Sequence, residues 1–159
     1  MEKLVVTLGI IALIFVLAVS NNQTKLTLFY PEPTNHVVDS ADVISDEVET
    51  QLNNKLAEAP TEVAVVTVKT TQPLDEASYA IELANKWGIG DKDKDDGILF
   101  LIVTEDRKLR IEVGSGAEAF MNDAKAGRIL NTYVVPELKN NNWEKGIING
   151  TDAILKEVK

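Results

Sequence analysis

Apolar positions form one long run near the start of the chain. Residues 4–19 are almost continuously apolar, and only Glu2 and Lys3 carry charge before them. The run is short for a membrane-spanning helix and ends in small residues, Ala18-Val19-Ser20, of the kind that a signal peptidase reads. We therefore predict that residues 1–20 are a cleaved signal peptide or an N-terminal membrane anchor, and that the rest of the chain is exported.

Helical periodicity appears in four later segments. Behind a candidate N-cap at Ser45, apolar residues recur every four positions to Leu56, which predicts a helix ending near Pro60. Residues 75–87 repeat the pattern, with the inward face predicted to hold Ala77, Ala80, Ile81, Ala84 and Trp87. Two more helices are predicted from about Asn122 and Asn142, with inward residues Ile129, Leu130, Tyr133, Val134, Trp143, Ile147, Ile154 and Val158, and Pro136 bending or ending the first.

Strand-like patterns lie between these helices. Residues 62–68 and 97–103 are β-branched or aliphatic almost throughout, as expected of central strands covered on both faces. The helix between them makes the two strands parallel. Residues 104–106 form a polar turn into 108–113, which alternates in polarity and predicts an antiparallel edge strand. The order predicts a three-layer α/β/α sandwich with a small mixed sheet.

Two prolines, Pro31 and Pro33, favour extended backbone ahead of this pattern. We interpret residues 21–35 as a tether that ends against the domain, and residues 36–159 as the domain itself.

Composition narrows the possible functions. The chain carries 16 Lys and Arg against 25 Asp and Glu, a formal net charge of −9, and such a surface repels nucleic acid. It has no Cys, which excludes disulfides, thiol chemistry and Cys-ligated metals, and its single histidine, His36, excludes sites built from several histidines.

The densest polar feature is the loop at residues 91–97, where acids stand close together ahead of a predicted strand. Clustered carboxylates repel each other unless a cation or water compensates them, which favours a divalent ion. The loop is not an EF-hand, because Asp96 stands where glycine is required and Ile102 where glutamate is required. The alternative is a solvated acidic turn that its own lysines partly neutralise.

The predicted hairpin strengthens the cation interpretation. It places Asp95 and Asp96 near the segment 114–118, whose glycines permit close approach and whose Glu118 adds a carboxylate, while Asp123 follows at a helix start. Oxygen-only ligands favour calcium or magnesium over zinc.

Enzyme motifs are weaker. Residues 114–119 fit a G-x-G-x-x-A pattern, but their strand closes a hairpin and lacks the parallel partner of a nucleotide-binding unit. Ser115 lacks the surroundings of a nucleophile, and its only possible base, His36, is distant in sequence. Three arginines could hold a phosphate or simply form ion pairs: Arg107, Arg110 and Arg128.

Several motifs taken together resemble one family. Its motifs are matched at residues 31–33, 37–45, 85–90 (Asn-Lys-Trp-Gly-Ile-Gly), 95–97, 107–118 and 123–129. In this order they resemble the TPM domain, a family named for a thylakoid lumen phosphatase-like protein, a photosystem II repair protein and a modulator of acetylcholine receptors. The resemblance covers about residues 31–156.

The resemblance implies an α/β/α sandwich, an exported location and a calcium or other divalent ion in an acidic pocket. The acids that match the family pattern are Asp39, Asp95, Asp96, Glu118 and Asp123. We predict a cation-binding module that assists or modulates membrane-protein complexes in the cell envelope, in the periplasm or on the outer face of the inner membrane. The alternative is a slow metal-dependent phosphatase.

Overall fold

The computed structural model describes residues 28–158. Its strands are β1 (Val37–Asp39), β2 (Val63–Val68), β3 (Ile98–Val103) and β4 (Lys108–Val113). Its helices are α2 (Asp46–Ala57), α3 (Glu76–Trp87), α4 (Asp123–Ile129), α5 (Val135–Lys139) and α6 (Trp143–Glu157), with a 3₁₀ turn at Ser115–Ala117 and a π-helical turn at Leu130–Val134.

The four strands form one mixed sheet in the order β1-β2-β3-β4. The first three are parallel, and β4 runs antiparallel to β3 at the edge. The two central strands and the edge hairpin confirm the prediction. The strand β1 was not predicted, because its three residues are too few to establish an alternating pattern.

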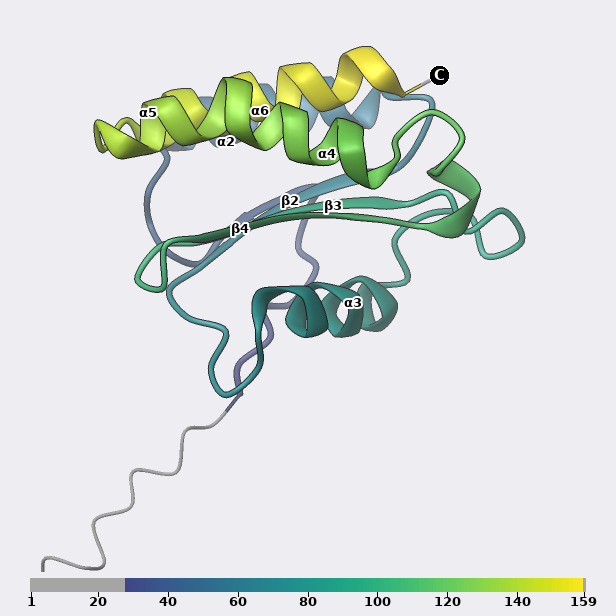
Figure 1. Ribbon diagram of the computed structural model, residues 1–159, viewed down its shortest axis with the longest axis horizontal. Coiled ribbons are helices and arrows are strands. Elements are labelled where there is room, and N and C mark those ends of the chain that lie inside the picture. The colour runs from purple at the N-terminus through teal and green to yellow at the C-terminus, as the bar shows by residue number, and fades with distance from the viewer. Residues whose placement is uncertain (1–27, 159) are drawn as a thin grey trace, which may run out of the picture.

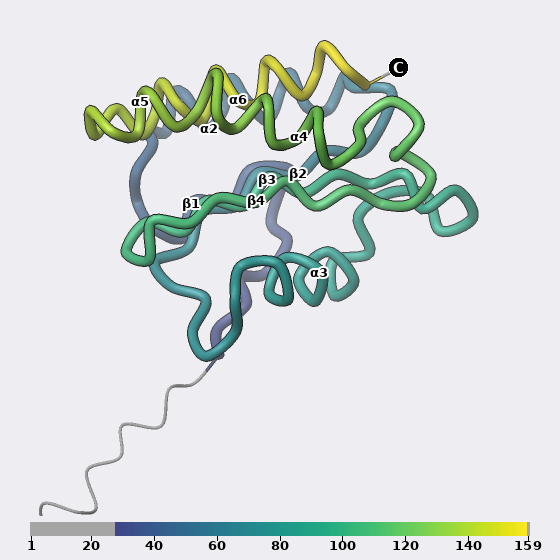
Figure 2. Tube along the Cα trace, in the orientation of Figure 1, coloured from purple at the N-terminus to yellow at the C-terminus, as the bar shows by residue number. Residues whose placement is uncertain are grey.

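Helices cover both faces of the sheet (Figure 1). Even-numbered β3 residues, such as Phe100, face a core shared with α2, α4 and α6, whereas odd-numbered ones, such as Leu101, face a core shared with α3. The Cα trace shows the same three layers, with α3 alone on its side among the described helices (Figure 2). The predicted α/β/α sandwich is therefore confirmed.

Local chemistry explains both ends of α3 but not the start of α2. The Asp75 side chain accepts hydrogen bonds from the amides of Ala77 and Ser78, and Gly88 ends α3 with a left-handed φ of 65°. Ser45 precedes α2 as predicted but does not cap it with its side chain. Its hydroxyl donates instead to Glu144 of α6, at 2.6 Å.

Two residues predicted to face inward are exposed. Ile81 lies beside the buried stripe of α3, which is centred on Ala80 and Leu83, and 46% of it is exposed. Tyr133 is 45% exposed because the π-helical turn before α5 adds a residue to the turn and changes the phase of the face.

Residues 28–31 belong to the folded domain. The Trp87 ring nitrogen donates to the carbonyl of Pro31 at 2.9 Å, and Tyr30 stacks on Tyr79 with ring centroids 4.8 Å apart. The described end of the predicted tether is thus fastened to α3, several residues ahead of the predicted domain start.

Between residues 28 and 158, no helix is long and apolar enough to cross a membrane. The predicted signal peptide or anchor at residues 1–20 lies outside the described residues.

Candidate functional site

The acidic loop meets the end of the hairpin at one end of the sheet. The amide of Gly114 donates to the carbonyl of Gly97 at 2.8 Å, which extends the β3–β4 pairing by one residue. Residues 91–97 therefore lie beside residues 114–118, as the predicted hairpin required.

Glycine is necessary for this close approach. The amide of Gly116 donates to the carbonyl of Asp95 at 2.8 Å. A Cβ atom on Gly116 would lie 1.8 Å from the carbonyl oxygen of Lys94, far inside van der Waals contact. Any side chain here would push the two segments apart.

Asp95 joins the two segments through its side chain. Its Oδ2 accepts hydrogen bonds from the Ser115 amide at 3.0 Å and from the Ser115 hydroxyl at 2.8 Å. The hydrogen bond from the Ser115 backbone amide contributes most, and the one from its hydroxyl contributes next, to holding the pKa of Asp95 below its usual value. Asp95 is therefore an ionised carboxylate at neutral pH.

The Asp91 carboxylate accepts backbone hydrogen bonds in the same way, within its own loop. Its Oδ1 accepts from the amides of Asp93 at 2.9 Å and Lys94 at 3.1 Å, and these two bonds lower its pKa. Asp96 in turn accepts from the amide of Asp91 at 3.0 Å. The two carboxylates thus organise the loop from inside.

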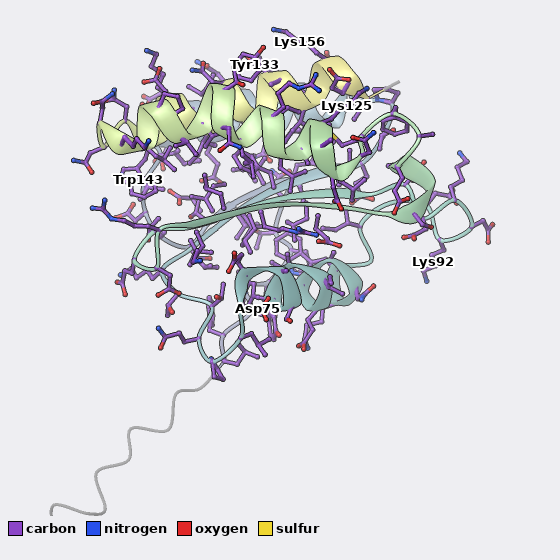
Figure 3. The ribbon with its side chains drawn as sticks, in the orientation of Figure 1. Asp75, Lys92, Lys125, Tyr133, Trp143 and Lys156 are labelled. Carbon is purple, nitrogen blue, oxygen red and sulfur yellow. The ribbon has the colours of Figure 1, made fainter. Side chains whose placement is uncertain are left out.

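These segments and the last turn of α3 enclose a cavity of about 560 Å³. Four of its lining residues are acids, and we call this cavity the acidic cleft: Asp91, Asp95, Glu112 and Glu118. Lys92 is the one lysine that lines it, and Figure 3 shows Lys92 in the loop at this end of the molecule. The arrangement concentrates negative charge in a concave site.

The donor set of the acidic cleft suits a hard cation only in part. Carboxylate oxygens are appropriate ligands for calcium or magnesium. However, within residues 28–158 no group of three or more acidic or histidine side chains is placed to hold a metal ion. Direct coordination by three carboxylates would therefore need side-chain movement, and otherwise backbone carbonyls and water must complete the shell.

Asp39 lies away from the acidic cleft. It ends β1 and aligns through Thr67 with Ile102, about 16 Å along β3 from Gly97 at the spacing of parallel strands. Its carboxylate accepts from the amides of Val43 at 2.8 Å and Ile44 at 2.9 Å, and from the Thr67 hydroxyl.

The five acids that the family resemblance implied are therefore not brought into one pocket. Because β1 and β3 are parallel, the end of one cannot meet the start of the other. In this structure Asp39 fastens the connection between β1 and α2.

Of the other predicted acids, only Asp95 and Glu118 line the acidic cleft. Asp96 supports the loop behind it. Asp123 is the first residue of α4 and exposed, and Asn122 caps that helix by accepting from the Lys125 amide at 3.0 Å.

The candidate phosphate-binding arginines are dispersed. Arg107 lies in the turn at the opposite end of the hairpin, and Arg128 is exposed on α4. Arg110 pairs with Glu112 at 2.7 Å. Ser115 donates to Asp95, and the structure puts no histidine among the residues that line the acidic cleft.

Glu112 is a cleft residue that the sequence interpretation missed. A signal for it was present, because Glu112 alternates with the core residues Ile111 and Val113 and must point to the α3 side of β4. Asp91, which was not among the five acids implied by the family resemblance, also lines the cleft.

Comparisons with known proteins agree with this fold. A family model of the TPM domain matches residues 37–157. The solution structure of the N-terminal domain of a P. gingivalis protein is 25% identical, with a TM-score of 0.73 over 82% of this chain and 92% of that one. No match was found among curated proteins.

Two further solution structures are similar in fold. The N-terminal domain of a Corynebacterium glutamicum protein is 14% identical, with a TM-score of 0.61 over 86% of this chain and 90% of that one. The BA42 protein of Bizionia argentinensis is 17% identical, with a TM-score of 0.62 over 72% of this chain and 80% of that one.

Proposed function

The chain belongs to the TPM domain family, and from that premise we propose that it is an exported module that binds a divalent cation, calcium or magnesium, in the acidic cleft. The observation that carries the proposal is the convergence of Asp91, Asp95, Glu112 and Glu118 on one cavity. Such a concentration of negative charge attracts a divalent ion over a monovalent one.

Asp91 and Asp95 each keep one carboxylate oxygen available to an ion, whereas Glu112 is already paired with Arg110. Asp91 and Asp95 each use one carboxylate oxygen to accept hydrogen bonds from backbone amides. The second oxygen of each accepts no hydrogen bond from the described residues. Asp95 and Glu118 would hold the ion from the two sides of the hairpin end, with Asp91 and water completing its shell. The ion supplies charge neutralisation that would draw the two segments together.

The proposed cellular role is to assist or modulate membrane-protein complexes in the envelope. The apolar run at residues 4–19 supports export and a location in the periplasm or on the outer face of the inner membrane. N-terminal sequencing of the native protein tests this. It should find either a start at Asn21 or retention of residues 1–20 in a membrane fraction, and a cytoplasmic protein with Met1 intact would contradict it.

Calcium titration of the full-length protein tests the binding site. Asp95→Asn and Glu118→Gln should each weaken calcium binding by at least about tenfold, or about 1.4 kcal/mol. Glu105→Gln is the matched control, because Glu105 is an exposed acid at the opposite end of the hairpin. If all three variants bind calcium like the parent, the acidic cleft is not the site.

A slow metal-dependent phosphatase is the second candidate, and no arrangement of arginines around the acidic cleft favours it. An assay with p-nitrophenyl phosphate, with and without calcium or magnesium, separates the two functions. Turnover that survives purification and falls in Asp96→Asn would establish the phosphatase instead.

A further inference from the structure

We propose that the other end of the β3–β4 hairpin binds the C-terminus of a peptide whose last residue is apolar. The peptide would add as a strand to the free edge of β4, with its terminal carboxylate on Arg107 and Lys139. This inference does not depend on the cation site, which lies at the opposite end of the same strands.

A second cavity, of about 260 Å³, lies between the start of β4 and the helices above it. Its apolar lining comes from four elements of the fold: Val103, Leu109, Val135, Leu138 and Trp143. Figure 1 shows α5 above the turned end of the hairpin, and Figure 3 shows Trp143 on that side of the molecule. The volume suits one large aliphatic side chain and is small for a drug-sized ligand.

Cations stand at the rim of this cavity, which we call the basic pocket. Arg107 and Lys139 both line it, both are exposed, and neither forms an ion pair or side-chain hydrogen bond with another described residue. The neighbouring Asp106 is engaged elsewhere, because it accepts from the Thr70 hydroxyl at 2.7 Å and the Thr71 amide at 3.1 Å.

Uncompensated cations are unexpected on a chain with a net charge of −9. Two of them beside an apolar cavity are complementary to a carboxylate attached to an apolar group. The C-terminal residue of a peptide has this chemistry.

The edge of β4 supplies the remaining contacts. Gly114 and Gly97 form a hydrogen-bonded pair, and such pairs alternate with non-bonded ones along an antiparallel ladder. Leu109 and Ile111 therefore direct their backbone amides and carbonyls away from β3. Because β4 is the last strand of the sheet, these groups can pair with an added strand.

Strand direction matches the charges. A peptide antiparallel to β4 runs from the Val113 end to the Lys108 end, so its carboxylate arrives at Arg107 and Lys139. Its last side chain then reaches the pocket beside Leu109, while its N-terminal part approaches the acidic cleft. A parallel peptide would bring its terminus to the acids instead.

The test is fluorescence anisotropy with full-length protein. The probe is an N-terminally labelled hexapeptide of alternating alanine and threonine that ends in leucine with a free carboxylate. We expect saturable binding, at least about tenfold weaker for the same peptide with a C-terminal amide. Hydrogen exchange with the unlabelled peptide should slow at the amides of Leu109 and Ile111.

Two variants test the cations, each with a control. Arg107→Asn removes the charge and keeps a residue that tolerates the left-handed φ of 52°, and Arg107→Lys retains the charge at the same position. Lys139→Glu reverses the second charge, and Lys156→Glu makes the same change at an exposed position of α6. Arg107→Asn and Lys139→Glu should each weaken peptide binding by at least about tenfold, and the controls by less than about twofold.

Three results would overturn the proposal. The first is equal binding of the acid and amide peptides. The second is no saturable binding of the acid peptide up to about 1 mM. The third is binding of octanoate at the basic pocket without binding of the peptide, which would assign the site to a free apolar carboxylate.

Discussion

The two ends of the β3–β4 hairpin differ in charge and in how the chain builds them. At one end, Asp91, Asp95, Glu112 and Glu118 surround the acidic cleft. At the other, Arg107 and Lys139 border a smaller apolar cavity. The same pair of strands supports both, so the length of the hairpin separates an acidic cavity from a basic one.

The acids of the cleft also differ from the acids near Asp39. At the cleft, backbone amides donate to carboxylates and lower the pKa of Asp91 and Asp95. At the start of α2, desolvation and the charges of Asp39 and Asp46 raise the pKa of Glu49. Amide donors let Asp91 and Asp95 stay ionised near each other, whereas Glu49 meets the charges of Asp39 and Asp46 with no such donor among the described residues.

The largest expected effect comes from separating the two segments of the acidic cleft. Gly116→Ala places a methyl group where Lys94 has its carbonyl, and should destabilise the fold by about 1–3 kcal/mol. It should also abolish calcium-dependent stabilisation. Thermal unfolding with and without calcium measures both effects.

Gly127→Ala is the control for this change. A Cβ atom on Gly127 meets no atom within 4 Å, and the residue lies in α4. Alanine should therefore stabilise the protein by about 0.5–1 kcal/mol and leave calcium binding intact. If Gly116→Ala behaves like Gly127→Ala, the close approach of the two segments is unimportant.

The sequence predicted the part of the site that is built from residues close together in the chain. The acids of residues 91–97 are contiguous, and a hairpin necessarily brings the residues before β3 to those after β4. The sequence therefore indicated Asp95 and Glu118 correctly as neighbours of one cavity. Glu112 was available from the alternation of β4 and was overlooked.

Other features depended on contacts distant in sequence. The position of Asp39 could not be derived without β1, because only the parallel pairing of β1 puts it at the far end of the sheet. The basic pocket joins Leu109 with Val135 and Trp143, from helices whose packing is not encoded in any local pattern. The π-helical turn likewise changed the face on which Tyr133 lies.

An intermediate effect is expected from removing the Ser115 hydroxyl, which donates a hydrogen bond to Asp95. Ser115→Ala removes one of the hydrogen bonds that lower the pKa of Asp95, so that pKa should rise but stay below its usual value, because the backbone amide remains. An NMR pH titration of the Asp95 carboxyl, without added divalent ions, measures the change.

The sign of the accompanying pH dependence follows from the lowered pKa. Asp95 stabilises the folded state above its unfolded pKa of about 3.9, and this stabilisation is lost as pH falls through the lower folded pKa. Ser115→Ala should therefore lower the Tm at pH 7 and have less effect near pH 3. An unchanged titration of Asp95 would show that its hydroxyl contact is absent in solution.

The smallest effect is expected at Glu49, in the repelling group of acids. Its raised pKa means that ionised Glu49 destabilises the fold, and that this penalty is absent at low pH and appears as pH rises. Glu49→Gln should raise stability at pH 7 by less than about 1 kcal/mol and have no effect near pH 3. A loss of stability at pH 7, measured by denaturant unfolding, would mean that this group attracts rather than repels.

Hydrogen exchange of the full-length protein, with and without millimolar calcium at constant ionic strength, tests the central claim most directly. The acidic cleft should be where the ion acts, so exchange should slow in residues 91–97 and 114–118 and remain unchanged in residues 39–46. Slowing confined to residues 39–46, or no slowing in either segment, would contradict the assignment of the cation site to the acidic cleft.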